Sequence, residues 1–430
     1  MRFRSLTLAL LLVGLAACGW TQPGFDAGRA NSNPFESTLT VSNVGALQHH
    51  VLPTTGAFPP VVLTIGDLVL VSGNGGVDAF PAASCPRADN GPCTARWRRD
   101  GQLLTADGSS IYVRTSATTF DSIGLDGVLT HRYDTTPAAG FFLTRLVSTG
   151  TYLVAELFKP GGTPTSRGTA YASVFSTNCT DNPCSQERSI PLATKYGSYF
   201  NWAAKGSVLY SADPANFDFL TAWDLGTGTA RWSAVAVPND IRVSNGLLYS
   251  TGGVVFDANG VNGCSGTPLI CTPLRNLDGA YEPDSIAGTR VLDVFALSGN
   301  PSPPSELRFW RTDAVGCTPS PVSCPSVARS APMTFASITG PGDRSSVAST
   351  SRLAFTVASV SSIGTANYLR AFDITGAAGC SGTPLVCAPL LDFNFANNLT
   401  FGSLVVAGGR VYAPTSDGAV HVFSLPGDVT

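Results

Sequence analysis

The sequence predicts an all-β protein that forms a single closed β-propeller of eight four-stranded blades, with seven blades as the open alternative. Three observations predict this fold class: short apolar segments of strand composition, a motif that recurs about every 49 residues, and no helical period after the amino terminus. The 43% of hydrophobic residues can supply a core, and the 45 glycines and 30 prolines are typical of many tight turns.

The repeat is clearest in two long matching segments. Residues 256–274 read FDANGVNGCSGTPLICTPL, and residues 372–390 read FDITGAAGCSGTPLVCAPL. Weaker copies begin at aromatic anchors, namely Phe80, Phe175, Trp223, Trp310 and Phe423, and a degenerate copy is expected around Ile123–Tyr133. From Phe80 to Phe423 there are seven steps of about 49 residues, a period typical of propellers or solenoids.

The pattern within a repeat favours the propeller. Apolar segments such as Leu68–Val71 and Leu353–Val357 precede the anchors and have strand composition. A turn, the anchor strand, a second turn and a final short strand follow. Three to four strands per repeat without helices describe a propeller blade, and we expect the anchor aromatic to pack between neighbouring blades.

The amino terminus predicts export. Arg2 and Arg4 precede an apolar run from Leu6 to Leu15, which is too short for a stable membrane helix and is typical of a signal peptide over residues 1–17. Leu15-Ala16-Ala17-Cys18 resembles the lipobox of bacterial lipoproteins, so Cys18 is the expected lipidation site. An ordinary signal peptide followed by a chance cysteine is the alternative. Residues 18–35 are expected to be a tether and lead-in, and residues 36–430 the propeller.

Ten of the 11 cysteines remain once Cys18 is assigned to lipid, and they form five close pairs. An even number, short spacing and an exported chain together favour five local disulfides. The pairs proposed from proximity are Cys85–Cys93, Cys179–Cys184, Cys264–Cys271, Cys317–Cys324 and Cys380–Cys387. Zinc is the rival interpretation, but zinc ligands normally lie two to four residues apart in pairs that converge on one ion.

The unit Ala222–Trp232, AWDLGTGTARW, resembles the repeat of PQQ-like (quinoprotein alcohol dehydrogenase-like) propellers. The opening of the mature chain, including Trp20–Asp26 and Asn33–Thr40, is similar to the lead-in of secreted bacterial members of that family. The resemblance implies that an amino-terminal strand, around Ala46–Leu52, completes the blade that ends at Phe423. It is specific for the fold rather than for an activity, because one scaffold hosts many functions.

No catalytic residue is predicted. Quinoprotein dehydrogenases carry two adjacent cysteines over the cofactor, and this chain has none. Asp224, Asp257 and Asp373 recur at one turn position and are expected to cap that turn through backbone N–H groups. The sequence has no HExxH, nucleophile elbow or P-loop, so no cofactor and no metal are expected.

Three further features have structural interpretations. His49 and His50 could form half of a metal site, but neighbouring strand residues point to opposite faces, which leaves one ligand at most. Gly73–Gly76 joins two strands and precedes no helix, so a hairpin turn is expected rather than a phosphate loop. Trp202 lies outside the repeat register, and its exposure is therefore of interest for sugar stacking.

The predicted function is a membrane-anchored envelope propeller that acts as a non-catalytic binding or assembly scaffold. We expect a lipid anchor in the membrane and an envelope protein or glycan as partner. A net charge of −3 gives no electrostatic reason to expect nucleic acid. The alternative is an enzyme at the mouth of the channel, either a PQQ-dependent dehydrogenase or a hydrolase. Inward carboxylates and an aromatic floor that converge at one end would indicate it.

Overall fold

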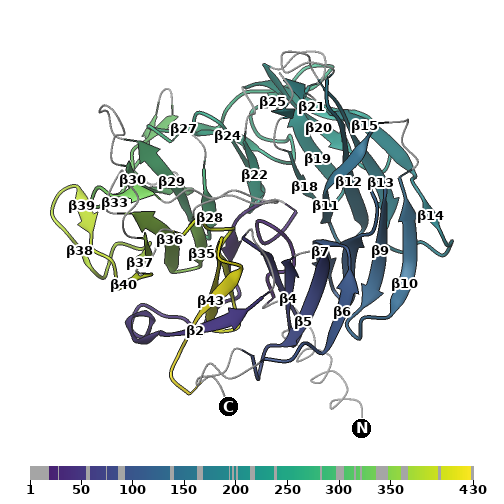
Figure 1. Ribbon diagram of the computed structural model, residues 1–430. Coiled ribbons are helices and arrows are strands. Elements are labelled where there is room, and N and C mark those ends of the chain that lie inside the picture. The colour runs from purple at the N-terminus through teal and green to yellow at the C-terminus, as the bar shows by residue number, and fades with distance from the viewer. Residues whose placement is uncertain are drawn as a thin grey trace, which may run out of the picture.

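The chain forms a closed ring of eight β-sheets in the computed structural model, and the described residues contain no α-helix (Figure 1). The structure describes residues 19–427 apart from 28, 55–58, 74, 86–92, 136–139, 162–167, 193, 196–197, 200–201, 214–217, 237–239, 281–282, 297–304, 314–315, 320–321, 336–346, 360–366 and 396–398. The eight-bladed propeller is confirmed, and the alternative of seven blades is wrong. The predicted signal peptide, residues 1–17, and Cys18 lie outside the described residues.

Each blade contains four antiparallel strands, of which the first lies at the centre of the ring and the fourth at its rim. Blades 1 to 3 contain β3 (Val61–Ile65), β4 (Leu68–Gly73), β5 (Gly76–Pro81) and β6 (Trp97–Asp100); β7 (Gln102–Asp107), β8 (Ser110–Arg114), β9 (Thr119–Gly124) and β10 (Leu129–Asp134); β11 (Phe142–Ser148), β12 (Tyr152–Lys159), β13 (Thr169–Ser176) and β15 (Arg188–Leu192). Blades 4 and 5 contain β18 (Ala203–Lys205), β19 (Val208–Ala212), β20 (Phe219–Asp224) and β21 (Ala230–Val235); β22 (Ile241–Ser244), β23 (Leu247–Ser250), β24 (Val254–Asp257) and β27 (Arg275–Leu277). Blades 6 to 8 contain β28 (Ser285–Ala287), β29 (Arg290–Ala296), β30 (Ser305–Arg311) and β33 (Ala328–Ser330); β35 (Val347–Thr350), β36 (Leu353–Ser359), β37 (Asn367–Asp373) and β40 (Leu391–Asn394); β41 (Val405–Ala407), β42 (Arg410–Pro414), β43 (Ala419–Ser424) and β2 (Gln48–Pro53).

Short accessory elements complete the structure. They are β1 (Ser32–Asn33), the 3-10 helix η1 (Val44–Ala46), β14 (Cys184–Ser185), β16 (Thr194–Lys195), β17 (Ser198–Tyr199), β25 (Cys264–Ser265), β26 (Ile270–Cys271), β31 (Thr318–Pro319), β32 (Val322–Cys324), β34 (Thr334–Phe335), β38 (Cys380–Ser381) and β39 (Leu385–Cys387). Most of these elements extend a blade at its centre or at its rim, and β16 pairs with β17 in a separate two-stranded sheet.

The repeat anchors all lie on the third strand of a blade. They are Phe80 on β5, Phe175 on β13, Trp223 on β20, Phe256 on β24, Trp310 on β30, Phe372 on β37 and Phe423 on β43. Ile123 holds the same position on β9, so the degenerate copy is a complete blade. Phe256 of blade 5 packs with Tyr210 and Trp232 of blade 4, which confirms the predicted packing between blades.

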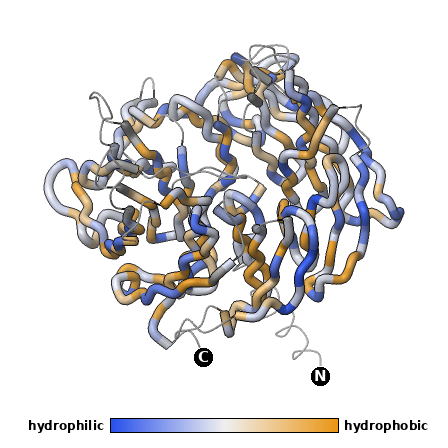
Figure 2. The backbone as a smooth tube through the Cα atoms, viewed as in Figure 1, coloured by the Kyte–Doolittle hydropathy of each residue, from blue (hydrophilic) through white to orange (hydrophobic). Residues whose placement is uncertain are grey.

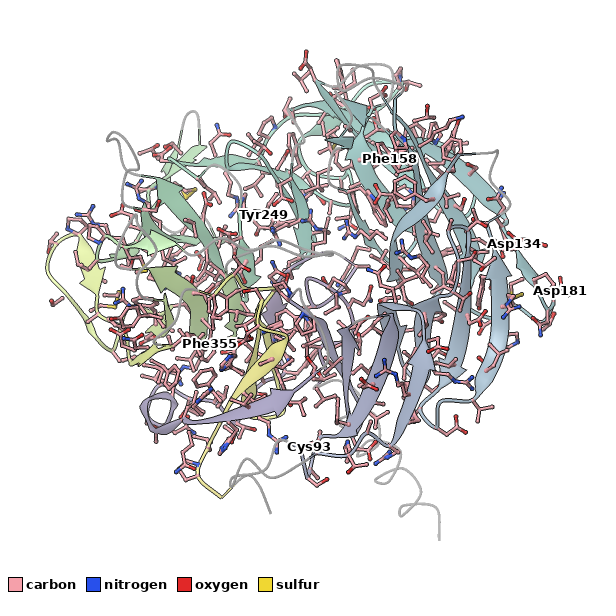
Figure 3. The ribbon with its side chains drawn as sticks, viewed as in Figure 1. Cys93, Asp134, Phe158, Asp181, Tyr249 and Phe355 are labelled. Atoms are coloured by element: carbon pink, nitrogen blue, oxygen red, sulfur yellow. A yellow bond between two sulfur atoms is a disulfide. The ribbon has the colours of Figure 1, made fainter. Side chains whose placement is uncertain are left out.

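The core consists of buried side chains between adjacent blades. Figure 2 shows hydrophobic stretches along the strands of the ring, and in Figure 3 Phe158 and Phe355 lie within it. A mostly apolar first and second strand is expected here because both are covered on two faces by neighbouring blades. The Gly73–Gly76 segment joins β4 to β5, as predicted for a hairpin turn.

The amino-terminal strand closes the ring. β2 pairs antiparallel with β43 and supplies the fourth strand of blade 8, with His49 opposite Phe423. This confirms the closing strand expected around Ala46–Leu52, although the strand begins at Gln48 and ends at Pro53. The first and last parts of the propeller are therefore joined by one sheet.

The two faces of the ring differ in their connections. Because the strands of a blade are antiparallel, the connections between first and second strands and between third and fourth strands open on one face. We call this the turn face, since all eight connections between first and second strands are only two or three residues long there. The opposite face, which carries the connections between second and third strands and between blades, is the loop face.

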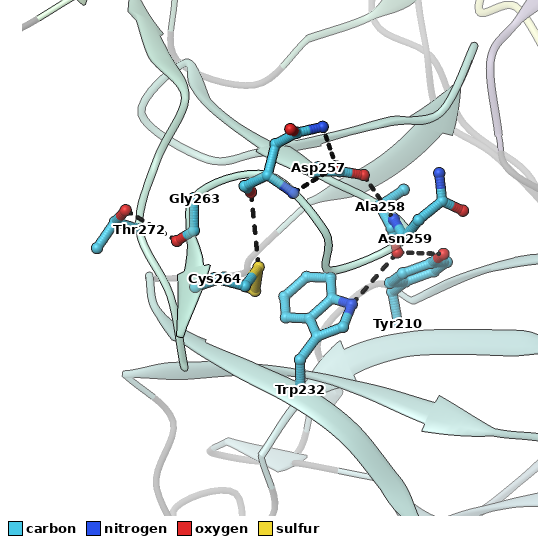
Figure 4. The surroundings of a disulfide bond; sticks show 10 residues. Tyr210, Trp232, Asp257, Ala258, Asn259, Gly263, Cys264 and Thr272 are labelled. Atoms are coloured by element: carbon cyan, nitrogen blue, oxygen red, sulfur yellow. Dashed lines mark hydrogen bonds between the residues drawn. A yellow bond between two sulfur atoms is a disulfide. The ribbon is translucent and has the colours of Figure 1, made fainter. Parts of the chain in front are cut away.

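A tryptophan on a fourth strand can fasten one blade to the next. Trp97 of β6 donates its indole N–H to the carbonyl of Leu125 in blade 2 at 2.8 Å, and Trp232 of β21 donates to Ala258 in blade 5 at 3.3 Å. Figure 4 shows the second contact, where Tyr210 also donates to Ala258. Gly260 makes room for this indole, since a Cβ atom there would lie 2.4 Å from Trp232 Cδ1.

Four of the predicted disulfides are present: Cys179–Cys184, Cys264–Cys271, Cys317–Cys324 and Cys380–Cys387. Each lies between the third and fourth strand of its blade, at the rim of the ring, where Figure 3 also shows Asp181. The sequence did not predict that the disulfide loops contact the preceding blade. β14, β26, β32 and β39 each pair in parallel with the fourth strand of the preceding blade, so each disulfide loop also ties two blades together.

The predicted fifth disulfide is wrong: Cys85 and Cys93 are not joined in the structure. In the Cys264–Cys271 and Cys380–Cys387 hairpins the two cysteines are direct cross-strand partners. Cys85 instead lies in a turn after β5, where its N–H donates to the carbonyl of Pro81 and its carbonyl accepts from Arg410. No described strand pair aligns Cys85 with Cys93 as the strands of those two hairpins align their cysteines.

Candidate functional site

The centre of the ring is occupied by the chain's own amino-terminal segment, residues 20–36, which we call the plug (Figure 1). Its first part follows the inner strands of blades 1 to 4. Trp20 exchanges two hydrogen bonds with Thr64 of β3, Thr21 accepts from Ala106 of β7, and Ala27 accepts from Ala204 of β18. Gln22 exchanges two hydrogen bonds with Ser148 of β11.

The second part of the plug continues around blades 5 to 8. Arg29 contacts Asp240 and Ile241 at the start of β22, and Ala30 accepts from Ile286 of β28. β1 pairs in parallel with β35 of blade 7. Asn33 donates to the carbonyl of Val406 in blade 8 at 2.9 Å. The plug thus contacts all eight blades in sequence order, and it lies almost wholly within residues 18–35, which the sequence predicted to be a tether and lead-in.

A buried charge cluster holds the middle of the plug. Arg29 forms an ion pair with Asp240 at 2.5 Å, and Arg242 pairs with the other oxygen of Asp240 at 3.1 Å. The Arg242 guanidinium also donates to the carbonyl of Arg29 at 2.7 Å. All three side chains are at most 8% exposed, so removal of one partner would leave a charge in a medium that solvates it poorly.

The carboxylates along the channel have structural partners. Glu36 accepts hydrogen bonds from the N–H groups of Thr38, Leu39 and Gly409. Asp26 pairs with Lys205 at 2.7 Å. The plug therefore lies in the channel on which the enzyme alternative depends, and these carboxylates fasten the plug to the ring.

Trp202 is only 1% exposed and does not offer a stacking surface for a sugar. The guanidinium of Arg145 lies 4.5 Å from the centre of its ring. Glu156 of β12 lies in the same region, is fully buried and accepts from the Thr144 hydroxyl at 3.0 Å. Burial raises the pKa of Glu156 to about 6, although Arg145 opposes the shift.

The three repeated aspartates cap their turns, as predicted. Asp224 accepts from the N–H of Thr227, Asp257 from those of Asn259 and Asn262, and Asp373 from those of Thr375, Ala377 and Ala378. Figure 4 shows the Asp257 turn beside its disulfide. Asp257 and Asp373 stabilise the turns from which two of the disulfide hairpins start, and the Asp224 turn belongs to a hairpin without cysteines.

The histidines lie at the ring closure. His49 of β2 and His421 of β43 are within hydrogen-bond distance, with 2.8 Å between Nε2 and Nδ1, and their rings stack. Phe393, Phe395 and Phe423 surround them. Burial first, and then the nearby His421 and His50, lower the pKa of His49 to about 4. The sequence indicated that His49 and His50 point apart, but it did not indicate the partner 372 residues away.

A groove between blades 1 and 2 combines charged and aliphatic side chains. It has a volume of about 410 Å³ and is lined by Arg98, Arg99, Asp100, Val113, Thr115, Asp121, Ile123, Leu129 and Arg132. β6 forms one wall, and no further described strand pairs with its outer edge. Aliphatic side chains of blade 2 lie between the charged ones.

Hydrogen bonds fix the arginines of this groove. Arg132 makes a two-point contact with Asp121 at 2.9 and 3.2 Å, and Arg98 pairs with Asp78 at 3.0 Å. Arg99 donates through Nε to the carbonyl of Gly127 at 2.7 Å. The Arg98 and Arg132 side chains remain about half exposed, at 48% and 53%. Ordered guanidinium groups beside aliphatic side chains are typical of protein-binding surfaces.

In the described part of the chain, no three His, Cys, Asp or Glu side chains gather closely enough to hold a metal ion. Within the same residues, no helix has the length and apolar character needed to cross a membrane.

Comparison with known proteins supports the fold alone. No protein-family model and no curated protein matches the chain. The C-terminal WD40 domain of Sif2 superimposes with a TM-score of 0.53 at 10% identity, over 90% of this chain and 98% of that one. BamB from Moraxella catarrhalis gives a TM-score of 0.30 at 12% identity, over 84% of this chain and 80% of that one. The chain is therefore a β-propeller whose function must be argued from its own surface.

Proposed function

We propose that this protein is an exported, lipid-anchored propeller that serves as a scaffold and binds a partner protein on the outside of its ring. The filled channel is the observation that carries the proposal. Residues 20–36 contact all eight blades, so the axis is occupied by the chain itself. A propeller of this kind offers its faces and the grooves between its blades for binding.

Export and anchoring belong to the same proposal. Local disulfides persist in oxidising compartments, and the structure holds four of them. The signal-peptide pattern of residues 1–17 supplies the export route, and Cys18 supplies the acylation site in the cell envelope. The resemblance to PQQ-like repeat proteins supports the same class of exported propeller, without a cofactor.

The groove between blades 1 and 2 is the proposed contact site. An acidic or amide side chain of the partner would bind Arg99 and Arg132, while an apolar side chain would cover Ile123 and Leu129. The outer edge of β6, with which no other described strand pairs, would add an extended segment of the partner by main-chain hydrogen bonds. The fold already uses this type of contact, since four disulfide loops add short strands to the edges of neighbouring blades.

The experiment is crosslinking in intact cells followed by capture of the tagged full-length protein from membranes. The test variant carries Arg99→Glu and Arg132→Glu. The control carries Arg231→Glu, because Arg231 is an exposed arginine that pairs with an aspartate in blade 4, outside the groove. We expect the test variant to lose a crosslinked partner that both the unmodified protein and the control retain.

The partner site is refuted if the test variant and the control yield the same crosslinked proteins at the same levels. Equal thermal unfolding of the two variants would establish that a loss is not caused by misfolding. Mass spectrometry of the amino-terminal peptide tests the anchor separately, and an unmodified Cys18 would refute that part of the proposal.

A further inference from the structure

The described chain enters the ring at the turn face. Trp20 donates its N–H to the Thr64 hydroxyl at 2.6 Å, and Thr64 donates its N–H to the Trp20 carbonyl at 2.8 Å. Thr64 is the next-to-last residue of β3, immediately before the short connection on the turn face. The start of the plug and the turn face therefore lie together.

No spacer separates this entry point from the residues that precede it. Trp20 is 1% exposed, and Gly19 fits so closely that a Cβ atom there would lie 2.8 Å from the Thr64 carbonyl oxygen. In sequence, therefore, Cys18 is bonded directly to a residue that packs against the ring.

Exposed apolar side chains gather on the same face. Phe35, which is 53% exposed, follows β1 beside Glu36 at the turn-face mouth of the channel. It is the outermost of three aromatic rings, with 6.5 Å between the centres of Phe35 and Phe25 and 5.4 Å between Phe25 and Trp20. The mouth thus presents an aromatic side chain to the surroundings.

The rim of the turn face adds further apolar groups. Val128, 56% exposed, lies between the third and fourth strands of blade 2, and Val261, 73% exposed, lies in the corresponding connection of blade 5. Ile270 is exposed in the same region of blade 5. Val235 is the one other exposed large hydrophobic side chain of the described residues, and it ends β21 at the loop face.

We propose that the turn face rests directly on the lipid surface, with Phe35 at its centre and Val128 and Val261 at its rim inserted among the headgroups. This inference rests on the anchor in the proposed function and adds the orientation of the ring. A lipid surface is the occupant because Cys18, the proposed acylation site, directly precedes Gly19, and Gly19 joins the ring at this face.

The orientation follows from the short connection. A long flexible tether would let the ring turn freely, whereas an acyl chain attached one residue before a packed glycine restricts the ring to positions near its entry point. Burial of each exposed apolar side chain then favours the turn face over the others by roughly tenfold. The loop face would point away from the membrane.

The test uses the full-length protein, purified from membranes and reconstituted in vesicles of phosphatidylcholine and phosphatidylglycerol with brominated acyl chains. Bromine quenches tryptophan emission only at close range. Phe35→Trp and Val128→Trp each add a reporter on the turn face, and Val235→Trp is the matched reporter on the loop face. We expect brominated vesicles to quench the emission added by Phe35→Trp and by Val128→Trp. The emission added by Val235→Trp should stay unchanged.

The outcomes separate this inference from the proposed anchor. Quenching at position 235 equal to that at positions 35 and 128, or no quenching at any of them, overturns the orientation even when mass spectrometry finds acyl chains on Cys18. If Cys18 carries no acyl chain, the anchor fails. The orientation is then tested with the non-acylated protein mixed with the same vesicles. Equal quenching at positions 35, 128 and 235, or no quenching at any of them, again overturns it.

Discussion

Acidification should loosen the ring at the closure between β2 and β43. Burial and the neighbouring His421 and His50 lower the pKa of His49 from 6.5 to about 4. The folded protein therefore resists protonation of His49, whereas the unfolded chain accepts a proton freely near pH 6.5. Stability from the neutral His49 is fully present above pH 6.5 and is lost as the pH falls toward 4.

The size of the effect follows from that difference. A full shift of this size corresponds to about 3 kcal/mol, and because His49 is only half-buried, solvent screening reduces the expected loss to about 1–2 kcal/mol. His421 changes in the same direction, since burial also lowers its pKa and Asp417 only partly opposes this. The pKa of His50 is lowered by burial and by Arg410.

The assay compares urea unfolding at pH 7 and pH 4.5 for the unmodified protein and for His49→Phe. Phenylalanine fits among Phe393, Phe395 and Phe423 and does not titrate. His131→Phe, on the fourth strand of blade 2 away from the closure, is the control. We expect His49→Phe to lose about 1–2 kcal/mol less on acidification than the other two proteins. Equal losses for all three proteins would refute the reasoning.

Three further changes test other parts of the structure. Glu156→Gln should raise stability by at most about 2 kcal/mol at pH 7.5 and leave it unchanged at pH 4, measured by thermal unfolding, because the raised pKa of Glu156 penalises its charged form as the pH rises through 6. Removal of one disulfide by Cys380→Ala with Cys387→Ala should cost about 2.5 kcal/mol in urea unfolding, since the closed loop is short. Gly260→Ala should cost clearly more than Gly288→Ala in the same assay: both glycines have left-handed φ angles, of 72° and 57°, but only the new Cβ atom at 260 would meet Trp232. Equal costs for the two alanine variants would contradict the packing argument.

The parts of the fold that the sequence predicted depend on local chemistry. Three anchors, Trp223, Phe256 and Phe372, are followed by a turn whose aspartate accepts nearby backbone N–H groups, and this produces a motif that repeats in the sequence. The closing strand came from the family resemblance. The repeat could not show that each disulfide loop reaches the preceding blade, because the partner strand lies in another copy of the motif.

The plug was not predicted because its contacts have no local pattern. Its partners extend from Thr64 to Gly409, and its backbone is irregular, so neither period nor turn chemistry marks it. One weak signal existed. In a chain with only 13% charged residues, Arg29, Asp240 and Arg242 stand out beside apolar strands, and buried charges of this kind need partners. Sequence alone could not show that these three residues pair with one another.

The plug also determines which contacts would resist a pulling force on the amino terminus of an anchored ring. A pull on the amino terminus acts first on Trp20 and Thr64 in blade 1, and then on each following blade through the hydrogen bonds of residues 21–36. The segment leaves the channel beside blade 8 and continues through η1 to β2, which pairs with the last strand of the chain. The plug cannot be withdrawn from the channel without breaking contacts in every blade. An anchor at this position would therefore hold the propeller through its axis, and the groove between blades 1 and 2 would keep a constant height above the membrane.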